Sequence, residues 1–295
     1  MSRHTYTASA ISTVEQRPRP GKHWRKLVRR NPIGFFSVLF LSLLALMAVA
    51  APLIAPYDPT QGSLLKRLLP PLSPGHILGT DALGRDMLSR LLYGARVSLL
   101  IALSTVLVSA VIGTVIGAFS GFRRGIIDRV LMRLIDVQLS FPFIVLALTV
   151  AAILGPSLRN IIITLVISSW VYYARLARAE TLKLTQKQFV EAASASGAKA
   201  HWIFLRHLIP NLVPTTIVMA SLEVGRIIVA EAGISFLGYG VQPPLAAWGN
   251  MISEGRHYIF SAWWLTVLPG AVISLAVLAA NLSGDWVRDV LDPQK

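Results

Sequence analysis

The sequence EAASASGAKAHWIFLRHLIPN, residues 191–211, separates two apolar runs in the second half of the chain. Thr185 and Gln188 have the spacing of a capping box, a hydroxyl followed three residues later by an amide, so we predict a helix from about Gln186. Gly197 then stands where a helix end favours a residue free to adopt positive φ. The first arm is rich in small side chains, which would let another surface approach its backbone closely.

A second helix is expected from about Lys199 to Leu208. It should end there, because Pro210 disfavours helical angles in the residue before it. Residues 185–211 therefore form a helix–Gly–helix elbow between membrane-length segments. This elbow could bind another protein through its first arm. The alternative is an amphipathic linker helix that packs only on its own bundle.

The composition is that of a membrane protein. The 295 residues are 54% hydrophobic and 14% charged, with a mean hydropathy of +0.61, whereas soluble domains carry about 25% charged residues. Cysteine is absent, which excludes disulfides, thiolate metal sites and thiol catalysis. The net charge of +14 is compatible with nucleic-acid binding or with basic cytoplasmic loops.

Six apolar runs predict an all-α, polytopic fold with six transmembrane helices. The first exceeds the apolar core of a signal peptide, so we expect an uncleaved span. The expected spans cover residues 33–55, 97–119, 134–154, 161–173, 212–233 and 263–282. The remaining organisation comprises a disordered basic tail at 1–32, an extracytoplasmic segment at 56–96, a five-helix transmembrane domain at 97–285 and a cytoplasmic C-terminus at 286–295.

Basic residues orient these spans. Of the 28 Lys and Arg residues, 20 fall in the tail, the 121–133 loop, the elbow region and the C-terminus, whereas 7 fall in the opposite segments. Because cytoplasmic loops are enriched in Lys and Arg, both termini and the elbow are expected in the cytoplasm. This distribution accounts for the basic charge without nucleic acid, and no nucleic-acid fold signature is present.

Two further patterns predict packing rather than ligand binding. Small residues recur every four positions in the second span, a stripe that lets two helices approach closely in lipid; these are Ser109, Gly113, Gly117 and Gly121. Ahead of that span, alternating acids and bases predict local ion pairs of little individual value; these are Asp81, Arg85, Asp86 and Arg90.

Charged residues in the fifth span are candidates for a pathway or gate, namely Glu223, Arg226 and Glu231. Glu223 and Arg226 are three residues apart, so they share a helix face. An ionised group at bilayer depth costs about 2.5–3.5 kcal/mol on insertion scales, so both should avoid lipid. They either line a transport pathway or form an internal pair that only neutralises itself.

The sequence carries no catalytic motif. It lacks GxxxxGK[ST] and HExxH, its six histidines are scattered, and it has no channel-type filter. The chain is therefore not expected to be an enzyme or to bind a cofactor or metal. The hypotheses are a pathway element driven by an outside energy source, or a stand-alone secondary transporter or channel.

The elbow resembles the EAA loop of ABC-importer permeases, in which a short coupling helix fits a groove on an ATP-binding subunit. The matching positions are Glu191, Ala192, Ala193, Gly197, His207, Pro210 and Asn211. Residues 76–99, 231–251 and 284–293 resemble the peptide/nickel permeases of that group. The resemblance covers nearly everything from residue 33 onward and implies a MetI-like transmembrane fold.

The resemblance also implies partners. A second homologous permease would pair with this chain, two ATP-binding subunits would bind ATP and dock on the elbows, and an extracytoplasmic substrate-binding protein would deliver the solute. Transport would cross the inner membrane by alternating access. Dipeptides, oligopeptides, glutathione and nickel are all carried within the group, so the substrate stays open.

Overall fold

The computed structural model describes residues 31–291, and this part of the chain is helical, with isolated bridges but no strand. The predicted tail lies outside the described residues except for positions 31 and 32, as do residues 292–295. The long helices are α2 (Pro32–Ile54), α3 (Met87–Arg123), α4 (Gly125–Leu139), α5 (Phe143–Leu154), α6 (Leu158–Leu184), α9 (Ile209–Phe236) and α11 (Trp264–Leu291). The short ones are η1 (Leu64–Lys66), α7 (Gln188–Ala195), α8 (Ala200–Ile203), the π-helical turn η2 (Phe204–Leu208), α10 (Trp248–Gly255) and η3 (Arg256–Tyr258).

Five helices are long and apolar enough to cross a membrane, and a sixth span exists if α4 and α5 are counted as one. The sequence predicts a third span at 134–154; the structure divides this stretch between α4 and α5, which are bent by 92° relative to each other. The break falls at Pro142, which caps α5 with a ψ of 130°. Proline has no N–H to donate and restricts the residue before it, so a continuous helix is disfavoured at this point.

Several spans are longer than predicted, because hydropathy marks only the part of a helix that suits the bilayer. The second begins at Met87 rather than at residue 97, since the Asp86 carboxylate accepts a hydrogen bond from the Ser89 backbone N–H at 2.8 Å and caps α3 there. The fourth continues to Leu184 and the sixth to Leu291.

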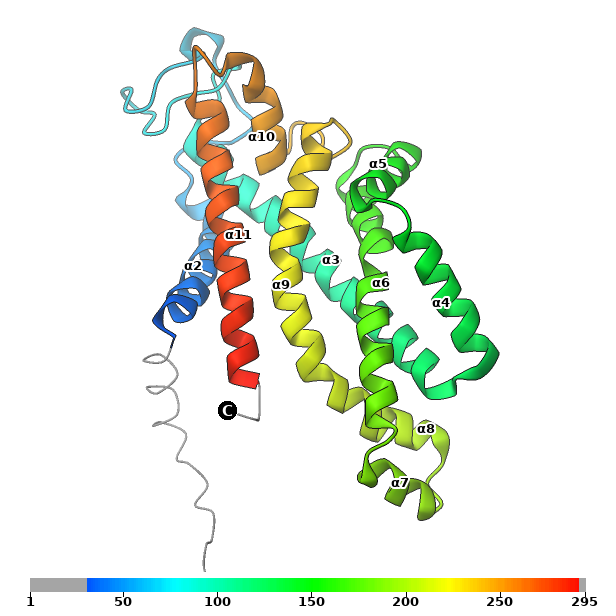
Figure 1. Cartoon of the computed structure of the whole chain (residues 1–295). Helices are drawn as coiled ribbons and strands as arrows, with labels where there is room; N and C mark the ends of the chain where they lie inside the picture. Colours follow the sequence, from blue (N-terminus) through cyan, green and yellow to red (C-terminus); the bar gives the residue numbers. More distant parts are fainter. Residues whose placement is uncertain (1–30, 292–295) are drawn as a thin grey trace, which may run out of the picture. The chain divides into compact units, whose positions relative to one another are not determined.

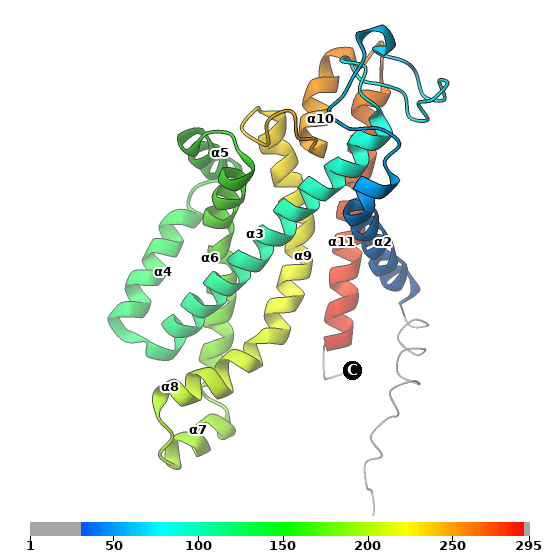
Figure 2. The same ribbon diagram turned by 180° about the vertical axis from the view of Figure 1, so that it is seen from behind.

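The small-residue stripe packs α3 against α6, as predicted. A Cβ at Gly117 would collide with the backbone of Ala174, and one at Gly113 would collide with Trp170. Ser109 is fully buried. Figures 1 and 2 show α3 running diagonally across α6 and α9, both of which it contacts.

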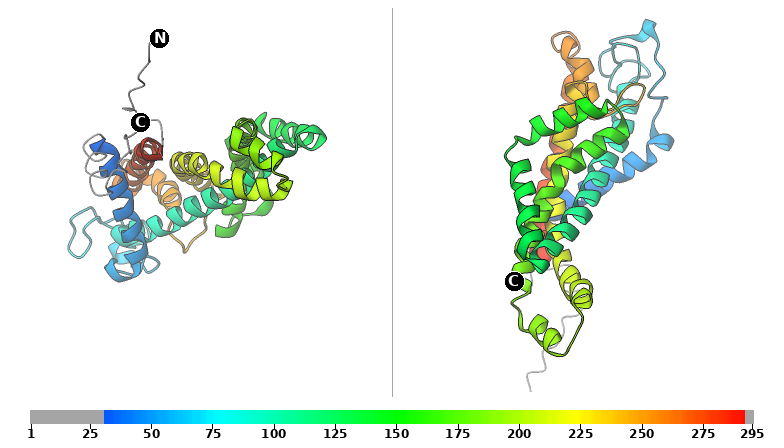
Figure 3. Two further views of the ribbon diagram at one scale, coloured as in Figure 1. Left: turned by 90° about the horizontal axis from the view of Figure 1, so that it is seen from below. Right: turned by 90° about the vertical axis from the view of Figure 1, so that its right-hand side faces the viewer.

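The main apolar core is built chiefly from α3, α9, α10 and α11, and it also includes buried residues of α2, α5 and α6. Trp248 at the start of α10 is completely buried, and its indole Nε1 donates to the Leu91 carbonyl at 3.2 Å. The α10 helix and residues 55–86 lie at one end of this bundle, whereas α7 and α8 lie at the other (Figures 1 and 3). The fold therefore presents two chemically different ends.

Candidate functional site

The elbow is the element for which the sequence predicts a partner. After α7, Gly197 adopts a φ of +79°, as predicted. The Ala198 N–H donates to the Ala193 carbonyl at 3.1 Å and the Gly197 N–H to Ser194 at 3.0 Å, which is a Schellman ending. A Cβ at Gly197 would meet nothing within 4 Å, so the requirement for glycine is conformational rather than steric crowding.

The predicted capping box is not formed. Helix α7 begins at Gln188 behind Lys187, which makes no side-chain cap. Thr185 instead ends α6, where its hydroxyl donates to the Leu182 carbonyl at 2.9 Å and accepts from the Arg124 guanidinium at 3.1 Å. The chain turns between the end of α6 and the start of α7, and Thr185 belongs to this turn, so it is not available to cap α7.

Pro210 does not stop the second arm of the elbow. The π-helical turn η2 connects α8 directly to α9, in which Pro210 lies in the first turn. Inside a continuous helix, proline removes the i→i−4 hydrogen bond and crowds the carbonyl four residues back; the wider π-helical turn lies directly before Pro210, where this disruption falls. Asn211, also in this turn, donates from its side-chain amide to the His207 carbonyl at 2.6 Å, so the structure brings these two predicted residues together.

One face of the elbow packs against the end of α3. Val190, Ile203 and Leu208 are buried in a small cluster with Phe122 and Phe204. The ring of His207 lies 4.8 Å from that of Trp202. The elbow is thus attached to the bundle through a limited apolar contact.

Outside this apolar contact, most of the elbow surface is exposed. Glu191 and Ala192 are exposed, Ala193 is half-buried, and Val190 is the buried residue of α7. Three large apolar side chains of the elbow are exposed as well, namely Phe189, Trp202 and Leu205. Exposed apolar groups beside small residues are typical of a surface that another protein covers.

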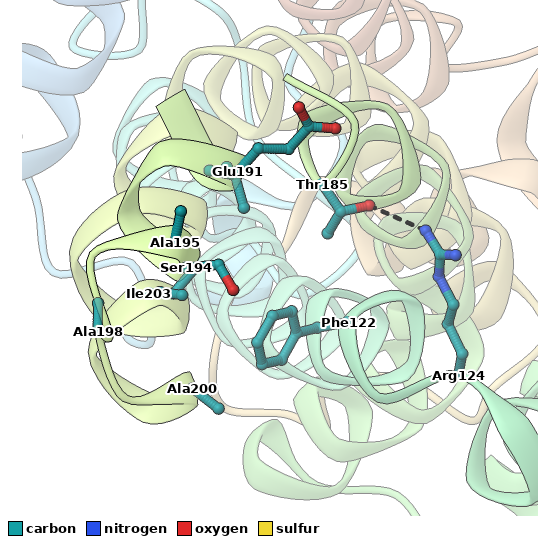
Figure 4. A pocket seen from close by; sticks show the side chains of 10 residues that line it. Phe122, Arg124, Thr185, Glu191, Ser194, Ala195, Ala198, Ala200 and Ile203 are labelled. Atoms are coloured by element: carbon teal, nitrogen blue, oxygen red, sulfur yellow. Dashed lines mark hydrogen bonds between the residues drawn. The ribbon is translucent and has the colours of Figure 1, made fainter. Parts of the chain in front are cut away.

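A cavity of about 760 Å³ lies between the elbow and the end of α3 (Figure 4). Its lining includes Glu191 and Ser194 from α7, Ile203 from α8, and Phe122 with Arg124 from the α3 end. In Figure 4 the Arg124–Thr185 hydrogen bond borders this space. The cavity separates α7 from the bundle over part of its length.

Two of the three charged residues predicted in the fifth span lie together. The Arg226 guanidinium donates to the Glu223 carboxylate at 2.5–3.0 Å. The same guanidinium lies between two rings, 4.5 Å from Phe143 of α5 and 4.4 Å from Tyr172 of α6, close enough for cation–π attraction. The pair therefore joins α5, α6 and α9.

Glu231 lies elsewhere in the bundle. It is completely buried and accepts hydrogen bonds from Ser98 at 3.1 Å and Ser235 at 2.7 Å. Its hydroxyl partners come from α3 and α9, so it holds these helices together away from the Glu223–Arg226 pair.

Sequence reasoning undervalued the charges ahead of α3. Asp81 accepts from Arg85 at 2.6 Å and also pairs with Arg90, and both arginines donate to Glu254 of α10 at 2.8 and 2.7 Å. Asp81, Arg85 and Arg90 are buried, so these are not the weak local pairs predicted. Alternating acids and bases beside a helix start hinted at pairing, but nothing local could reveal Glu254.

A second buried pair lies beside this network. His76 Nδ1 is 2.9 Å from the Asp86 carboxylate, and the Tyr57 ring covers the imidazole at 4.9 Å. Asp86 also caps α3. The two sets of contacts together fix residues 56–86 onto the start of α3 and onto α10.

Comparison with known proteins assigns the chain to a family. Residues 113–295 match the family described as binding-protein-dependent transport system inner membrane component, and residues 21–71 match the N-terminal transmembrane domain of oligopeptide transport permease C. The chain belongs to the first family, and it is a multi-pass inner-membrane component of a transport system rather than an enzyme. Its family relationship implies ATPase and binding-protein partners in general.

Individual relatives match over almost the full length. The chain is 38% identical to the probable D,D-dipeptide transport system permease protein of Escherichia coli K12 over 97% of this chain and 96% of that protein. It is 41% identical to a di/tripeptide transport system permease protein of Pseudomonas aeruginosa, over 99% and 97% of the two chains. It is 40% identical to a glutathione transport system permease protein of Pectobacterium atrosepticum, over 92% and 90%.

The fold also has a solved neighbour. A chain of the MetNI methionine ABC transporter, in inward facing conformations, superposes with a TM-score of 0.57 at 18% identity, covering 70% of this chain and 98% of that chain. The predicted all-α, MetI-like permease fold is confirmed.

Proposed function

We propose that this chain is the permease subunit of an ATP-driven importer that moves peptides, or a chemically related small solute, across the inner membrane. The observation that carries the proposal is the elbow, whose Gly197-dependent turn presents an exposed α7 beside exposed apolar side chains. The names of the relatives, which include dipeptide, di/tripeptide and glutathione permeases, support a peptide-like substrate.

In the proposed assembly, this chain pairs with a second, homologous permease. Two ATP-binding subunits dock on the two elbows and bind the ATP, while an extracytoplasmic binding protein delivers the solute at the opposite end. Closure of the ATP-binding subunits would displace the elbows. Because η2 continues without a break into α9, that displacement would be passed to α9 and reorient the spans.

The residues of the elbow divide into two roles in this proposal. Glu191, Ala192 and Ala193 form the surface that meets the ATP-binding subunit, since small side chains permit a close approach. Gly197, His207, Pro210 and Asn211 set the shape of the turn and its passage into α9. The competing hypothesis, a stand-alone transporter or channel, leaves this exposed surface without a partner.

Purification from the native membrane tests the proposal. The complex should contain ATP-binding subunits, and its ATP hydrolysis should rise when the loaded binding protein is added. A lone oligomer of this chain that transports solute without ATP would overturn it.

Topology is tested separately with a reporter that is active only in the cytoplasm. Fused after residue 295 or inserted near Lys199 it should be active, and inserted near Gln61 it should be inactive. Activity near Gln61 would contradict the proposed orientation, in which both termini and the elbow are cytoplasmic.

We also propose that Glu223 and Arg226 line the pathway or its gate. Their side chains are 12% and 32% exposed, so the guanidinium is not sealed within the bundle. The contacts of Arg226 with α5 and α6 would make this pair sensitive to movement among the three helices. The alternative is a pair that only neutralises itself. Glu231, predicted as a third member, lies apart from the pair and is proposed to act indirectly, by holding α9 to α3 through its hydrogen bond from Ser98.

A further inference from the structure

A second cavity, of about 650 Å³, lies between α4 and α6. Its lining combines charged and apolar side chains: Ile126, Asp128, Arg129, Val130, Met132, Arg133 and Asp136 from α4, with Arg178 from α6. None of these residues belongs to the elbow or to the Glu223–Arg226 pair. The cavity is therefore a separate site, and the proposed transport function gives it no role.

One acid and one base of this cavity are already matched. The Arg178 guanidinium donates from Nε and Nη2 to the two oxygens of Asp128 at 2.6 and 2.7 Å, and the Ser120 hydroxyl donates to the same carboxylate at 2.6 Å. This arrangement fixes Arg178 at the cavity wall and neutralises Asp128.

The other two guanidinium groups have no such match. Arg129 and Arg133 lie one turn apart on α4 and are exposed, and neither guanidinium forms an ion pair or hydrogen bond within residues 31–291. Asp136, also exposed, is the remaining acid. The cavity therefore carries an excess positive charge and two free arginine forks, which match the oxygens of a phosphate.

The arginines border an exposed apolar stripe on the same helix. Ile126 is 71% exposed, Leu134 59% and Val130 54%, and with 3.6 residues per turn they form a row beside Arg129 and Arg133. Ile126 and Val130 also line the cavity. A soluble anion would use only the arginines, whereas a molecule with a phosphate joined to hydrocarbon would use both surfaces.

The position of the cavity along the chain favours a membrane lipid. Helix α4 follows Arg123 and Arg124 in the short basic loop that the charge distribution assigns to the cytoplasm. Amphipathic helices with basic polar faces bind at the membrane interface, and the cytoplasmic surface of a bilayer is negative. Basic pockets between helices on that side bind anionic headgroups.

We propose that the α4–α6 cavity binds an anionic phospholipid of the cytoplasmic leaflet. Arg129 and Arg133 hold the phosphodiester, and the acyl chains lie along Ile126, Val130 and Leu134. This inference rests on the orientation given under the proposed function, but not on the identity of the solute. Lipid bound here would hold the start of α4 at the membrane surface, beside the α3 end that contacts the elbow.

Retention of lipid by the purified complex tests the proposal. The complex is reconstituted in nanodiscs of phosphatidylcholine alone or mixed with phosphatidylglycerol, and bound phosphatidylglycerol is measured by native mass spectrometry after detergent release. The variant Arg129→Gln/Arg133→Gln should bind phosphatidylglycerol about tenfold more weakly, because each arginine near an anionic surface contributes several-fold in affinity. Arg288→Gln, a control that removes one exposed positive charge at the end of α11, should bind like the wild type, and the single variants Arg129→Gln and Arg133→Gln, which each remove one charge as well, should each bind more weakly.

One further variant and one competition experiment complete the test. Asp136→Asn should bind phosphatidylglycerol more tightly, since it removes the remaining acid without disturbing the arginines, and it serves if the double variant folds poorly. Glycerol phosphate, a headgroup without acyl chains, should not displace the lipid. The proposal is overturned if the double variant and Asp136→Asn both bind like the wild type, if glycerol phosphate competes fully, or if the double variant loses only its pairing with the second permease. Lipid retention is read without transport, so its failure is distinguishable from failure of the proposed function.

Discussion

At one end of the bundle, charged side chains of residues 76–90 are buried and paired with one another and with α10; at the other end, the elbow exposes most of its first helix. Arg90 is 2% exposed and meets both Asp81 and Glu254, whereas Glu191 of the elbow lines an open cavity. Both ends are polar, so polarity alone does not separate them.

The difference lies in what satisfies the polar groups. Buried charges must have partners within the chain, because an uncompensated charge in a low-dielectric interior is strongly destabilising. The elbow has water, and in the proposed assembly a second protein, as its partner. We therefore expect substitutions at the buried end to affect folding, and substitutions at the elbow to affect transport while the chain still folds.

The largest expected effect is that of Arg90→Gln. Removing one partner of a buried ionic network costs about 3–5 kcal/mol, because Asp81 and Glu254 lose a shared counter-charge. The thermal unfolding temperature and the yield of assembled complex should both fall sharply. Glu254→Gln is the matched control: its side chain is 33% exposed, so its loss should be smaller. If both variants lowered the unfolding temperature and the yield only slightly and by the same amount, the buried charges would not be needed for folding.

The second largest effect is expected from Gly197→Val, which should lower the rate of transport. A β-branched residue resists the φ of +79° found at this position, and left-handed helical angles cost a non-glycine residue roughly 1–2 kcal/mol. We expect transport and stimulated ATP hydrolysis to be largely lost while the amount of folded permease stays close to normal.

Gly197→Asn provides the control, since asparagine tolerates positive φ and nothing lies within 4 Å of the added Cβ. It should retain most of the transport activity. Normal transport in the valine variant would show that the shape of the elbow is not used for coupling.

These two sites also show which features a sequence can reveal. The positive φ of Gly197 was predictable, because the end of a helix is decided by neighbouring residues. The six apolar segments were predictable from hydropathy, and the close approach of a helix at Gly113 and Gly117 was predictable from their four-residue spacing, but the sequence did not indicate that the partner would be α6. Glu254, by contrast, lies 164 residues from Arg90 in sequence, and no local pattern specifies which distant carboxylate a buried arginine will meet.

The errors at the elbow and in α4–α5 have a related cause. The hydroxyl of Thr185 suits a helix start, but the tertiary arrangement places Arg124 beside it and uses it at a helix end. Pro142 was visible within an apolar run, yet hydropathy alone could not distinguish a mild kink from the observed bend of 92°. In both cases the local signal was present but left the geometry open: at Thr185 because Arg124 lies beside the hydroxyl, and at Pro142 because a proline break does not fix the bend angle.

Glu223→Gln distinguishes the two hypotheses for the charged pair of α9. If the pair lines the pathway, the complex should assemble and hydrolyse ATP, while the transport rate changes several-fold. If the pair only neutralises itself, Arg226 loses its counter-charge within the bundle and the complex should assemble poorly. Size-exclusion yield and transport are therefore measured on the same preparation. If both the size-exclusion yield and the transport rate stay at wild-type values, the pair neither lines the pathway nor stabilises the bundle.

The smallest effect is expected from Thr185→Ala, which tests how firmly the elbow is attached to the bundle. The variant removes the hydrogen bonds of the hydroxyl with Leu182 and Arg124. Because this site is only partly buried and water can replace the lost partners, the free energy of unfolding should fall by about 0.5–1 kcal/mol. The Arg124–Thr185 bond is, however, a direct polar link between the ends of α3 and α6 beside the elbow cavity. Its loss should therefore reduce the ratio of transported solute to ATP hydrolysed more clearly than it reduces stability. Thr185→Ser keeps the hydroxyl and should restore that ratio; equal ratios in the alanine and serine variants would show that the elbow is held by its apolar cluster alone.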